Sequence, residues 1–188
     1  MPYKFTFLVD GERQFSAPLV CERCEGRTKT GQQCSRNTCI GTRWCFQHLS
    51  TKKLRIKTSR IPQAGKGLFA VDASTGAAGA VVFKPGEKII AYDGELVDRA
   101  TIDSRYGVHT APYGIEVSRD RLEDGALHRG IGTLANHPVA PYRSNARFSN
   151  SQRRIALVAT RTIRHDDEIL VNYGRSYRFD EPTTYRTR

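Results

Sequence analysis

The stretch Ala64-Gly65-Lys66-Gly67-Leu68-Phe69-Ala70 says more about the fold than any other part of the sequence. It places two glycines directly before an apolar run. Glycine lets the backbone approach a ligand closely and leaves amide and carbonyl groups free to bond it. Such a turn is also common between ordinary strands, so its meaning depends on the sequence around it.

Short apolar runs separated by glycine-bearing turns continue along the chain after this stretch. Each run has the length of a strand, and no window carries the pattern of a long amphipathic helix. The runs cover residues 68–71, 80–83, 88–92, 113–117, 154–159 and 169–171. The sequence therefore predicts an irregular, mostly β domain.

Composition narrows the class of protein further. The 188 residues are 38% hydrophobic and 26% charged, which is typical of a soluble globular chain. Thirty basic residues against 19 acidic ones give a net charge of +11, which favours polyanionic partners such as nucleic acid or chromatin. No apolar run approaches the length of a membrane span, and residues 1–14 do not resemble a signal peptide. We expect an intracellular protein without a membrane partner.

All five cysteines lie between positions 21 and 45, in a segment with few aliphatic residues. Such a segment needs a metal to fold. Cys24, Cys34, Cys45 and His48 supply the thiolate and imidazole ligands of a closed tetrahedral zinc site. Two further cysteines keep the ligand set open: Cys21 forms a Cys-x-x-Cys pair with Cys24, and Cys39 is the leading substitute. A closed site predicts a structural zinc ion rather than a catalytic one.

This segment resembles a small cysteine/histidine motif of giant-virus and protist proteins. In that motif a Cys is followed by Thr-Lys-x-Gly-x-x-Cys and then by Cys-x-x-His. The matching positions are Cys24, Thr28-Lys29-Thr30-Gly31-Gln32-Gln33-Cys34 and Cys45-Phe46-Gln47-His48. The resemblance favours Cys24, Cys34, Cys45 and His48 as ligands, and it suggests a viral protein.

The region from about position 54 to position 177 resembles the SET domain of protein lysine methyltransferases, because the family's motifs occur in the family's order. They are matched by Gly65-Lys66-Gly67-Leu68-Phe69-Ala70, Gly86-Glu87-Lys88-Ile89, Tyr92-Asp93-Gly94-Glu95, Asn136-His137, Asn145-Ala146-Arg147-Phe148, Ala159-Thr160-Arg161-Thr162-Ile163, Asp167-Glu168-Ile169 and Tyr173-Gly174. The resemblance implies a β-clip fold of short strands with a pseudoknot. A small zinc-stapled module precedes it.

The resemblance also implies a function, transfer of a methyl group from S-adenosylmethionine to a lysine of a histone or another basic chromatin protein. It assigns Tyr173 and Tyr92 to catalysis. It assigns cofactor binding to Ala64, Gly65, Lys66, Gly67, Asn136, His137 and Tyr173. A nuclear location, or a virion and host nucleus, would follow.

Two channel positions are implied in the same way. Phe148 and Val171 stand where the family's residues limit the number of methyl groups added, and neither carries a hydroxyl. The site is therefore expected to proceed beyond monomethyllysine. A core position for Phe148 is the alternative, since a three-residue insertion precedes Asn145.

Two other departures from the family concern the ends of the site. Pro138 follows the Asn-His pair in place of the usual serine. No cysteine follows Tyr173 in this sequence, so we expect no zinc-binding segment of the kind that follows the domain in several subfamilies. The tail with Tyr177 and Phe179 is expected to close the channel instead.

The sequence divides into four parts. We expect an N-terminal arm (1–16), the zinc module (17–50), the SET domain (52–178) and a loosely held basic tail (179–188). A different function also remains open: a zinc-containing module that binds chromatin or nucleic acid and has weak catalysis or none.

Overall fold

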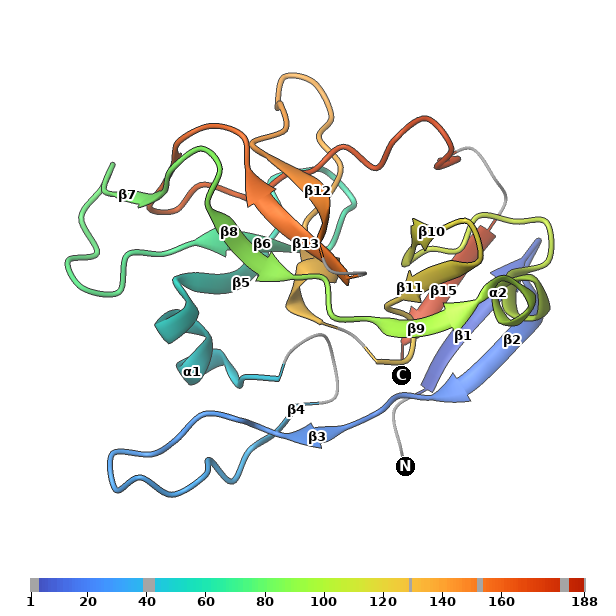
Figure 1. The fold of residues 1–188 in the computed structure, drawn as a ribbon, viewed down its shortest axis with the longest axis horizontal. Coiled ribbons are helices and arrows are strands. Elements are labelled where there is room, and N and C mark those ends of the chain that lie inside the picture. Colours follow the sequence, from blue (N-terminus) through green and yellow to red (C-terminus); the bar gives the residue numbers. More distant parts are fainter. Residues whose placement is uncertain (1–3, 39–42, 129, 152–153, 180–182, 188) are drawn as a thin grey trace.

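The computed structural model describes residues 4–38, 43–128, 130–151, 154–179 and 183–187. Short strands dominate it (Figure 1). The strands are β1 Lys4–Val9, β2 Glu12–Pro18, β3 Glu22–Arg23, β4 Asn37–Thr38, β5 Leu54–Thr58, β6 Lys66–Ala70, β7 Val81–Phe83, β8 Lys88–Ala91, β9 Glu95–Asp98, β10 Gly114–Ser118, β11 Arg121–Asp124, β12 Ala146–Ser151, β13 Arg154–Ala159, β14 Ile163–Arg164 and β15 Thr183–Thr187. The helices are α1 Phe46–Leu49, α2 Arg99–Tyr106 and the 3-10 turns Ser50–Lys52 and Ile131–Leu134.

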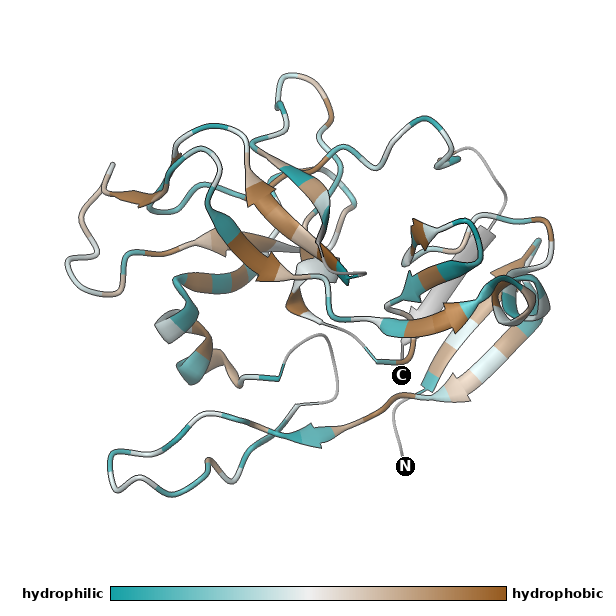
Figure 2. Cartoon of the chain, viewed as in Figure 1, coloured by the Kyte–Doolittle hydropathy of each residue, from teal (hydrophilic) through white to brown (hydrophobic). Residues whose placement is uncertain are grey.

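The main core lies among three small sheets, with strand orders β12-β13-β8, β5-β6 and β14-β7. In Figure 2, strands β7, β8 and β13 of this core are largely brown, because each was an apolar run in the sequence. The side chains that fill it include Leu54, Leu68, Leu157, Ile163 and Ile169, each no more than 1% exposed. The predicted mostly β fold is confirmed, and each predicted run forms a strand or lies in the pseudoknot.

The pseudoknot is formed by residues 168–171, which pass between three other segments. Glu168 pairs antiparallel with Phe69, Leu170 pairs parallel with Asn136, and Val171 pairs parallel with Ala146. This short segment therefore brings the glycine turn, the Asn-His pair and the start of β12 together.

A second core lies between the N-terminal hairpin, α2 and the sheet β10-β11-β9. Phe7 packs edge-on against Tyr106 of α2, with ring centroids 5.1 Å apart. Asp124 is fully buried here, where it accepts hydrogen bonds from Arg105 at 2.8 Å and from the Tyr106 hydroxyl at 2.9 Å. A buried carboxylate persists only when such partners replace water.

The predicted N-terminal arm is the hairpin β1-β2, whose turn uses Asp10 and Gly11 at positive φ. This Asp-Gly pair suits the tight turn of a two-stranded hairpin. The predicted loose tail is wrong, because β15 pairs with β1 over five residues, from Phe5–Thr187 to Val9–Thr183. Open edge strands bind further strands readily, and β1 offers such an edge to residues 183–187.

No helix in the described ranges is long and apolar enough to cross a membrane.

Candidate functional site

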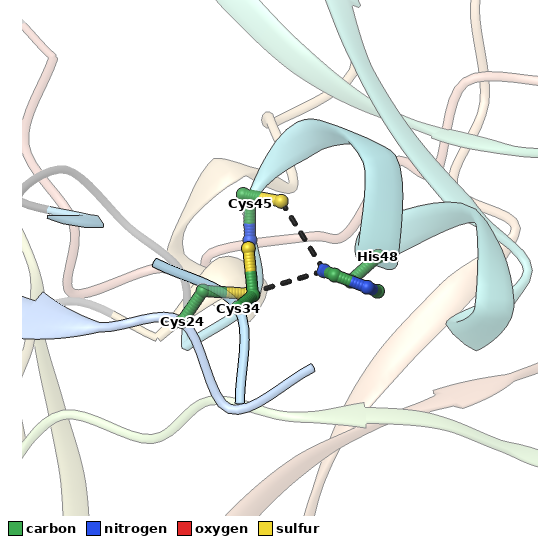
Figure 3. A group of neighbouring side chains, drawn as sticks. All are labelled: Cys24, Cys34, Cys45 and His48. Carbon is green, nitrogen blue, oxygen red and sulfur yellow. Dashed lines mark hydrogen bonds between the residues drawn. The ribbon is translucent and has the colours of Figure 1, made fainter. Parts of the chain in front are cut away.

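A compact group of four side chains forms a candidate metal centre beside α1 (Figure 3). The ligand atoms of Cys24, Cys34, Cys45 and His48 all lie within 4.8 Å of one another. Nδ1 of His48 is 3.4 Å from the sulfur of Cys24 and 3.4 Å from that of Cys45. Tetrahedral zinc, with bonds of about 2.3 Å to sulfur and 2.0 Å to nitrogen, separates two such ligands by about 3.5 Å. The donor set and its spacing therefore fit zinc.

Surrounding groups orient these ligands. Nε2 of His48 lies 2.8 Å from the carbonyl of Arg27, an arrangement that directs the Nδ1 lone pair toward the sulfurs. The sulfur of Cys24 accepts hydrogen bonds from the amides of Gly26 and Cys45. Gly26 has no room for a side chain, since a Cβ there would lie 2.2 Å from the His48 ring. Gly26 is a requirement of the site that the sequence did not reveal.

The two thiols beside His48 differ in acidity. Burial raises the pKa of Cys24. Burial also opposes ionisation of Cys45, but backbone hydrogen bonds from His48 and Gln47 outweigh it and lower the pKa of Cys45 to about 7. Cys45 is therefore the first of the pair to become a thiolate, the form that binds metal.

The sequence also offered Cys21 and Cys39 as alternative zinc ligands. Cys21 is disulfide-bonded, so the pairing of Cys21 with Cys24 as a second zinc knuckle is wrong. Cys39, the leading substitute, lies outside the described residues.

One side chain of the zinc module reaches the turn after β8. Nε of Arg43 lies 2.8 Å from Oδ2 of Asp93, and Nη2 donates to Oδ1 at 3.3 Å. Burial lowers the pKa of Arg43, but the charges of Asp93 and Glu25 more than offset this. Arg43 precedes the ligand Cys45 by two residues, and Asp93 directly follows Tyr92. The metal centre is thus tied to the backbone that carries Tyr92.

Tyr92, Phe148 and Tyr173 converge on a narrow pocket with a volume of about 40 Å³. Tyr113, Thr133, Ala135 and Tyr177 also line it. The hydroxyl of Tyr173 donates to the carbonyl of Ala135 at 3.1 Å, and that of Tyr92 donates to the carbonyl of Tyr113 at 2.8 Å. Burial raises the pKa of Tyr92, so its phenol stays protonated. Aromatic walls of this kind attract a methylammonium group.

Val171 has a different position from Phe148. Phe148 lines the pocket and lies edge-on to Tyr92, with centroids 6.0 Å apart. Val171 is fully buried in the main core and is not among the residues that line the pocket.

The glycine turn is held to the pseudoknot by one buried carboxylate. Glu168, 4% exposed, accepts hydrogen bonds from the Ser59 hydroxyl at 2.6 Å and the Arg60 amide at 2.7 Å. Asn136 donates from Nδ2 to the same carboxylate at 3.2 Å and to the carbonyl of Lys66 at 3.0 Å. A Cβ on Gly67 would lie 2.3 Å from Oε1 of Glu168, so the close approach of this carboxylate explains why position 67 has no side chain. Gly65 is required for a different reason, its φ of +70°.

The predicted pair Asn136-His137 lies next to Tyr173. Nδ1 of His137 accepts the amide of Tyr173 at 3.2 Å. Burial lowers the pKa of His137, so the ring is neutral near pH 7. Oδ1 of Asn136 accepts no hydrogen bond from any residue of the described ranges, so it can accept one from a ligand.

The tail covers this region with two aromatic rings. Tyr177 lies 4.9 Å from the ring of Tyr173, and Phe179 lies 4.9 Å from the ring of His137. Phe179 also stacks on Tyr173, with an interplanar angle of 11°. We call Tyr177 and Phe179 the aromatic lid.

The structure thus brings together Tyr92, Tyr173, Phe148, Asn136 and His137 around one region. Sequence reasoning missed Tyr113 and Thr133 as lining residues, and it missed the role of Glu168. Glu168 was quoted within a motif, but only the fold shows that its carboxylate joins three segments.

The strand-rich fold, the glycine turn and the tyrosine pocket are the features that the SET-domain resemblance implied. A comparison with known protein families supports the same class. The SET domain family model matches residues 75–174, more than half of the chain. The chain therefore belongs to the SET-domain family.

One curated protein is similar to this chain over much of its length. The chain is 27% identical over 154 residues to a protein of Cryptococcus neoformans var. neoformans serotype D (strain B-3501A), described as histone-lysine N-methyltransferase, H3 lysine-4 specific. The match covers 77% of this chain and 10% of that protein, so the chain spans about a tenth of its relative's length.

Proposed function

We propose that this protein is a protein-lysine N-methyltransferase that uses S-adenosylmethionine. The observation that carries the proposal is the convergence of Tyr92, Tyr173 and Phe148 on one narrow pocket. The Asn136-His137 pair lies directly beside it, with Nδ1 of His137 bonded to the amide of Tyr173.

The residues beside the pocket suit such a cofactor. Oδ1 of Asn136 is free to accept from an ammonium group, and the neutral ring of His137 adds no positive charge beside a sulfonium. The turn from Ala64 to Gly67 lies beside Asn136, which donates to the carbonyl of Lys66, and Phe179 offers an aromatic face. When bound, S-adenosylmethionine would supply the electrophilic methyl group.

The residues of the chain would orient and desolvate the acceptor lysine. Burial between Tyr92, Phe148 and Tyr113 disfavours the ammonium form of that lysine and so lowers its pKa from about 10.4 toward neutrality. The fixed hydroxyl of Tyr173 would position the amine, and the pocket walls would limit its approach to one direction. Alignment of this kind can contribute several kcal/mol to the barrier reduction.

We further propose that the substrate is a histone tail or another basic chromatin protein. Residues 93–124 support this, because they carry eight acidic and four basic side chains in a chain that is otherwise strongly basic. Strand β10, which supplies Gly114 and Ile115 to the pocket, belongs to this segment. A nuclear setting, in a cell or in an infected host, would suit such a substrate.

Cofactor binding tests the proposal directly. Calorimetric titration with S-adenosylmethionine is expected to reveal one saturable site. Asn136→Ala is expected to weaken the affinity for S-adenosylmethionine at least tenfold. The variant loses the free Oδ1 and the hydrogen bond from Nδ2 to the carbonyl of Lys66. Asn150→Ala is the matched control, since Asn150 makes one side-chain bond, to Val117, away from the cofactor region. Absence of saturable binding to the wild-type protein would leave a non-catalytic binding module as the better interpretation.

The number of methyl groups added is a separate expectation. Phe148 carries no hydroxyl to hold a water beside the amine, so a methylated lysine can rotate and react again. We expect mass spectrometry of a substrate peptide to find di- or trimethyllysine at long reaction times. Phe148→Tyr is expected to shift the product toward monomethyllysine. A wild-type reaction that stalls at monomethyllysine with cofactor in excess would refute this role of Phe148.

A further inference from the structure

A second hollow, with a volume of about 460 Å³, lies beside the pseudoknot and shares no lining residue with the tyrosine pocket. Four of its lining residues are arginines: Arg60, Arg143, Arg161 and Arg164. Tyr142 also lines it and is 39% exposed. We call this feature the arginine hollow. Part of its wall, including Tyr142 and Arg143, comes from the segment that carries the insertion before Asn145.

Backbone carbonyls hold three of these guanidinium groups in place. Arg161 donates to the carbonyl of Arg143 at 2.7 Å, Arg164 to that of Gly79 at 2.7 Å, and Arg60 to that of Asp166 at 2.9 Å. A carbonyl orients a guanidinium without neutralising it. Arg161 and Arg164 are therefore fixed by carbonyls alone and keep their positive charge, an arrangement suited to phosphate oxygens.

Most of the hydrogen bonds of the acidic groups around the hollow go to partners other than its arginine side chains. Glu168 is buried and bonded to Ser59, Arg60 and Asn136, and Asp167 accepts the backbone amide of Arg164. Asp166 pairs with Lys57 and, at 3.4 Å, with Arg60. Four arginines thus face two lining carboxylates, which leaves the hollow positively charged.

The net charge of the chain outside residues 93–124 favours a long anion over a small one. Residues 93–124 carry a net charge of −4, so the remainder of the chain carries +15. The arginine hollow lies in that basic remainder. A polyanion gains from every basic group along its path, whereas a single phosphate group gains only from the hollow.

We propose that the arginine hollow binds the phosphate backbone of double-stranded DNA. Binding there would leave the acidic segment 93–124 and its pocket free for a basic peptide. The inference rests on the hollow itself and does not require methyl transfer.

Fluorescence anisotropy of a labelled DNA duplex, titrated with the full chain at several salt concentrations, tests this site. The double variant Arg143→Gln/Arg161→Gln is expected to weaken binding at least tenfold at low salt. It should also reduce the slope of log affinity against log salt by about 2, because each phosphate contact contributes about 0.9. The variant Arg143→Lys/Arg161→Lys retains the charge and should retain most of the affinity.

The matched control is Arg119→Gln/Arg121→Gln, which removes the same charge from exposed positions in the acidic segment. It is expected to change DNA affinity less than twofold, with thermal unfolding midpoints equal among the variants. Equal weakening by both double variants would overturn the assignment, because net charge alone would then explain binding. The proposal also fails if DNA does not bind while inorganic phosphate or a phosphopeptide binds saturably. Methyl transfer to a free peptide should be the same in Arg143→Gln/Arg161→Gln as in the wild-type protein, so failure here is distinct from failure of the proposed enzyme activity.

Discussion

Replacing Tyr173 by phenylalanine is expected to reduce the turnover of methyl transfer at least a hundredfold while leaving cofactor affinity within about twofold. The hydroxyl, held by the carbonyl of Ala135, is the group proposed to position the amine, and misplacement of a reacting group by about 1 Å can cost this much. A phenylalanine ring keeps the contacts with His137 and Phe179, so the cofactor region and the aromatic lid should persist.

Single-turnover kinetics with a labelled methyl donor, together with calorimetry, would separate the two effects. Tyr142→Phe is the control, because it removes the hydroxyl of a tyrosine outside the pocket. A Tyr173→Phe protein with near wild-type turnover would exclude Tyr173 from the mechanism.

Loss of one metal ligand is expected to have the largest effect on stability. Cys45→Ser should abolish stoichiometric zinc and unfold the zinc module, because this segment has little apolar core of its own. Cys24, Cys34 and Cys45, with Trp44 packed against them, form its only buried cluster within the described residues. Structural zinc contributes apparent binding energies of about 10 kcal/mol or more in small domains. Elemental analysis and thermal unfolding would measure both losses.

Gln47→Ala, on an exposed position of α1 between two ligands, is the matched control and should bind zinc normally.

Acidification should release the metal, since protons compete for the thiolates, among them Cys45 with its pKa of about 7. Because Arg43 ties the module to Asp93, the Cys45→Ser protein should also have a higher KM for a peptide substrate. Wild-type protein that contains no zinc, or that is fully stable in a strong chelator, would contradict the assignment.

Local patterns in the sequence were enough to predict several of the strands and the four clustered ligands. Strands such as β6 and β13 are apolar runs with turns at their ends, and Asp10-Gly11 marks the first hairpin. Cys24, Cys34, Cys45 and His48 were found because their residue types have few other uses at this density. In each case the signal lies within the segment itself.

Pairings between distant segments could not be predicted in this way. Glu123 lies in β11 and is fully buried, yet a carboxylate in a strand normally indicates an exposed face. It is stabilised there by the amides of Gly94 and Ile155, each at 2.9 Å and each about 30 residues away. The pairing of β15 with β1 depends likewise on an edge that only the folded chain creates. Tail composition alone suggested a loose segment.

The pairing of β1 with β15 has a mechanical consequence for the aromatic lid. The two strands are antiparallel, so positions 5 and 187 form one end of the ladder. Tension applied at these two positions would break the backbone hydrogen bonds one pair at a time, by unzipping, whereas shear would have to break them together. Unzipping requires the smaller force. A stretched chain should therefore release β15, and with it the anchor nearest to Phe179, before the cores around Leu157 or Tyr106 yield.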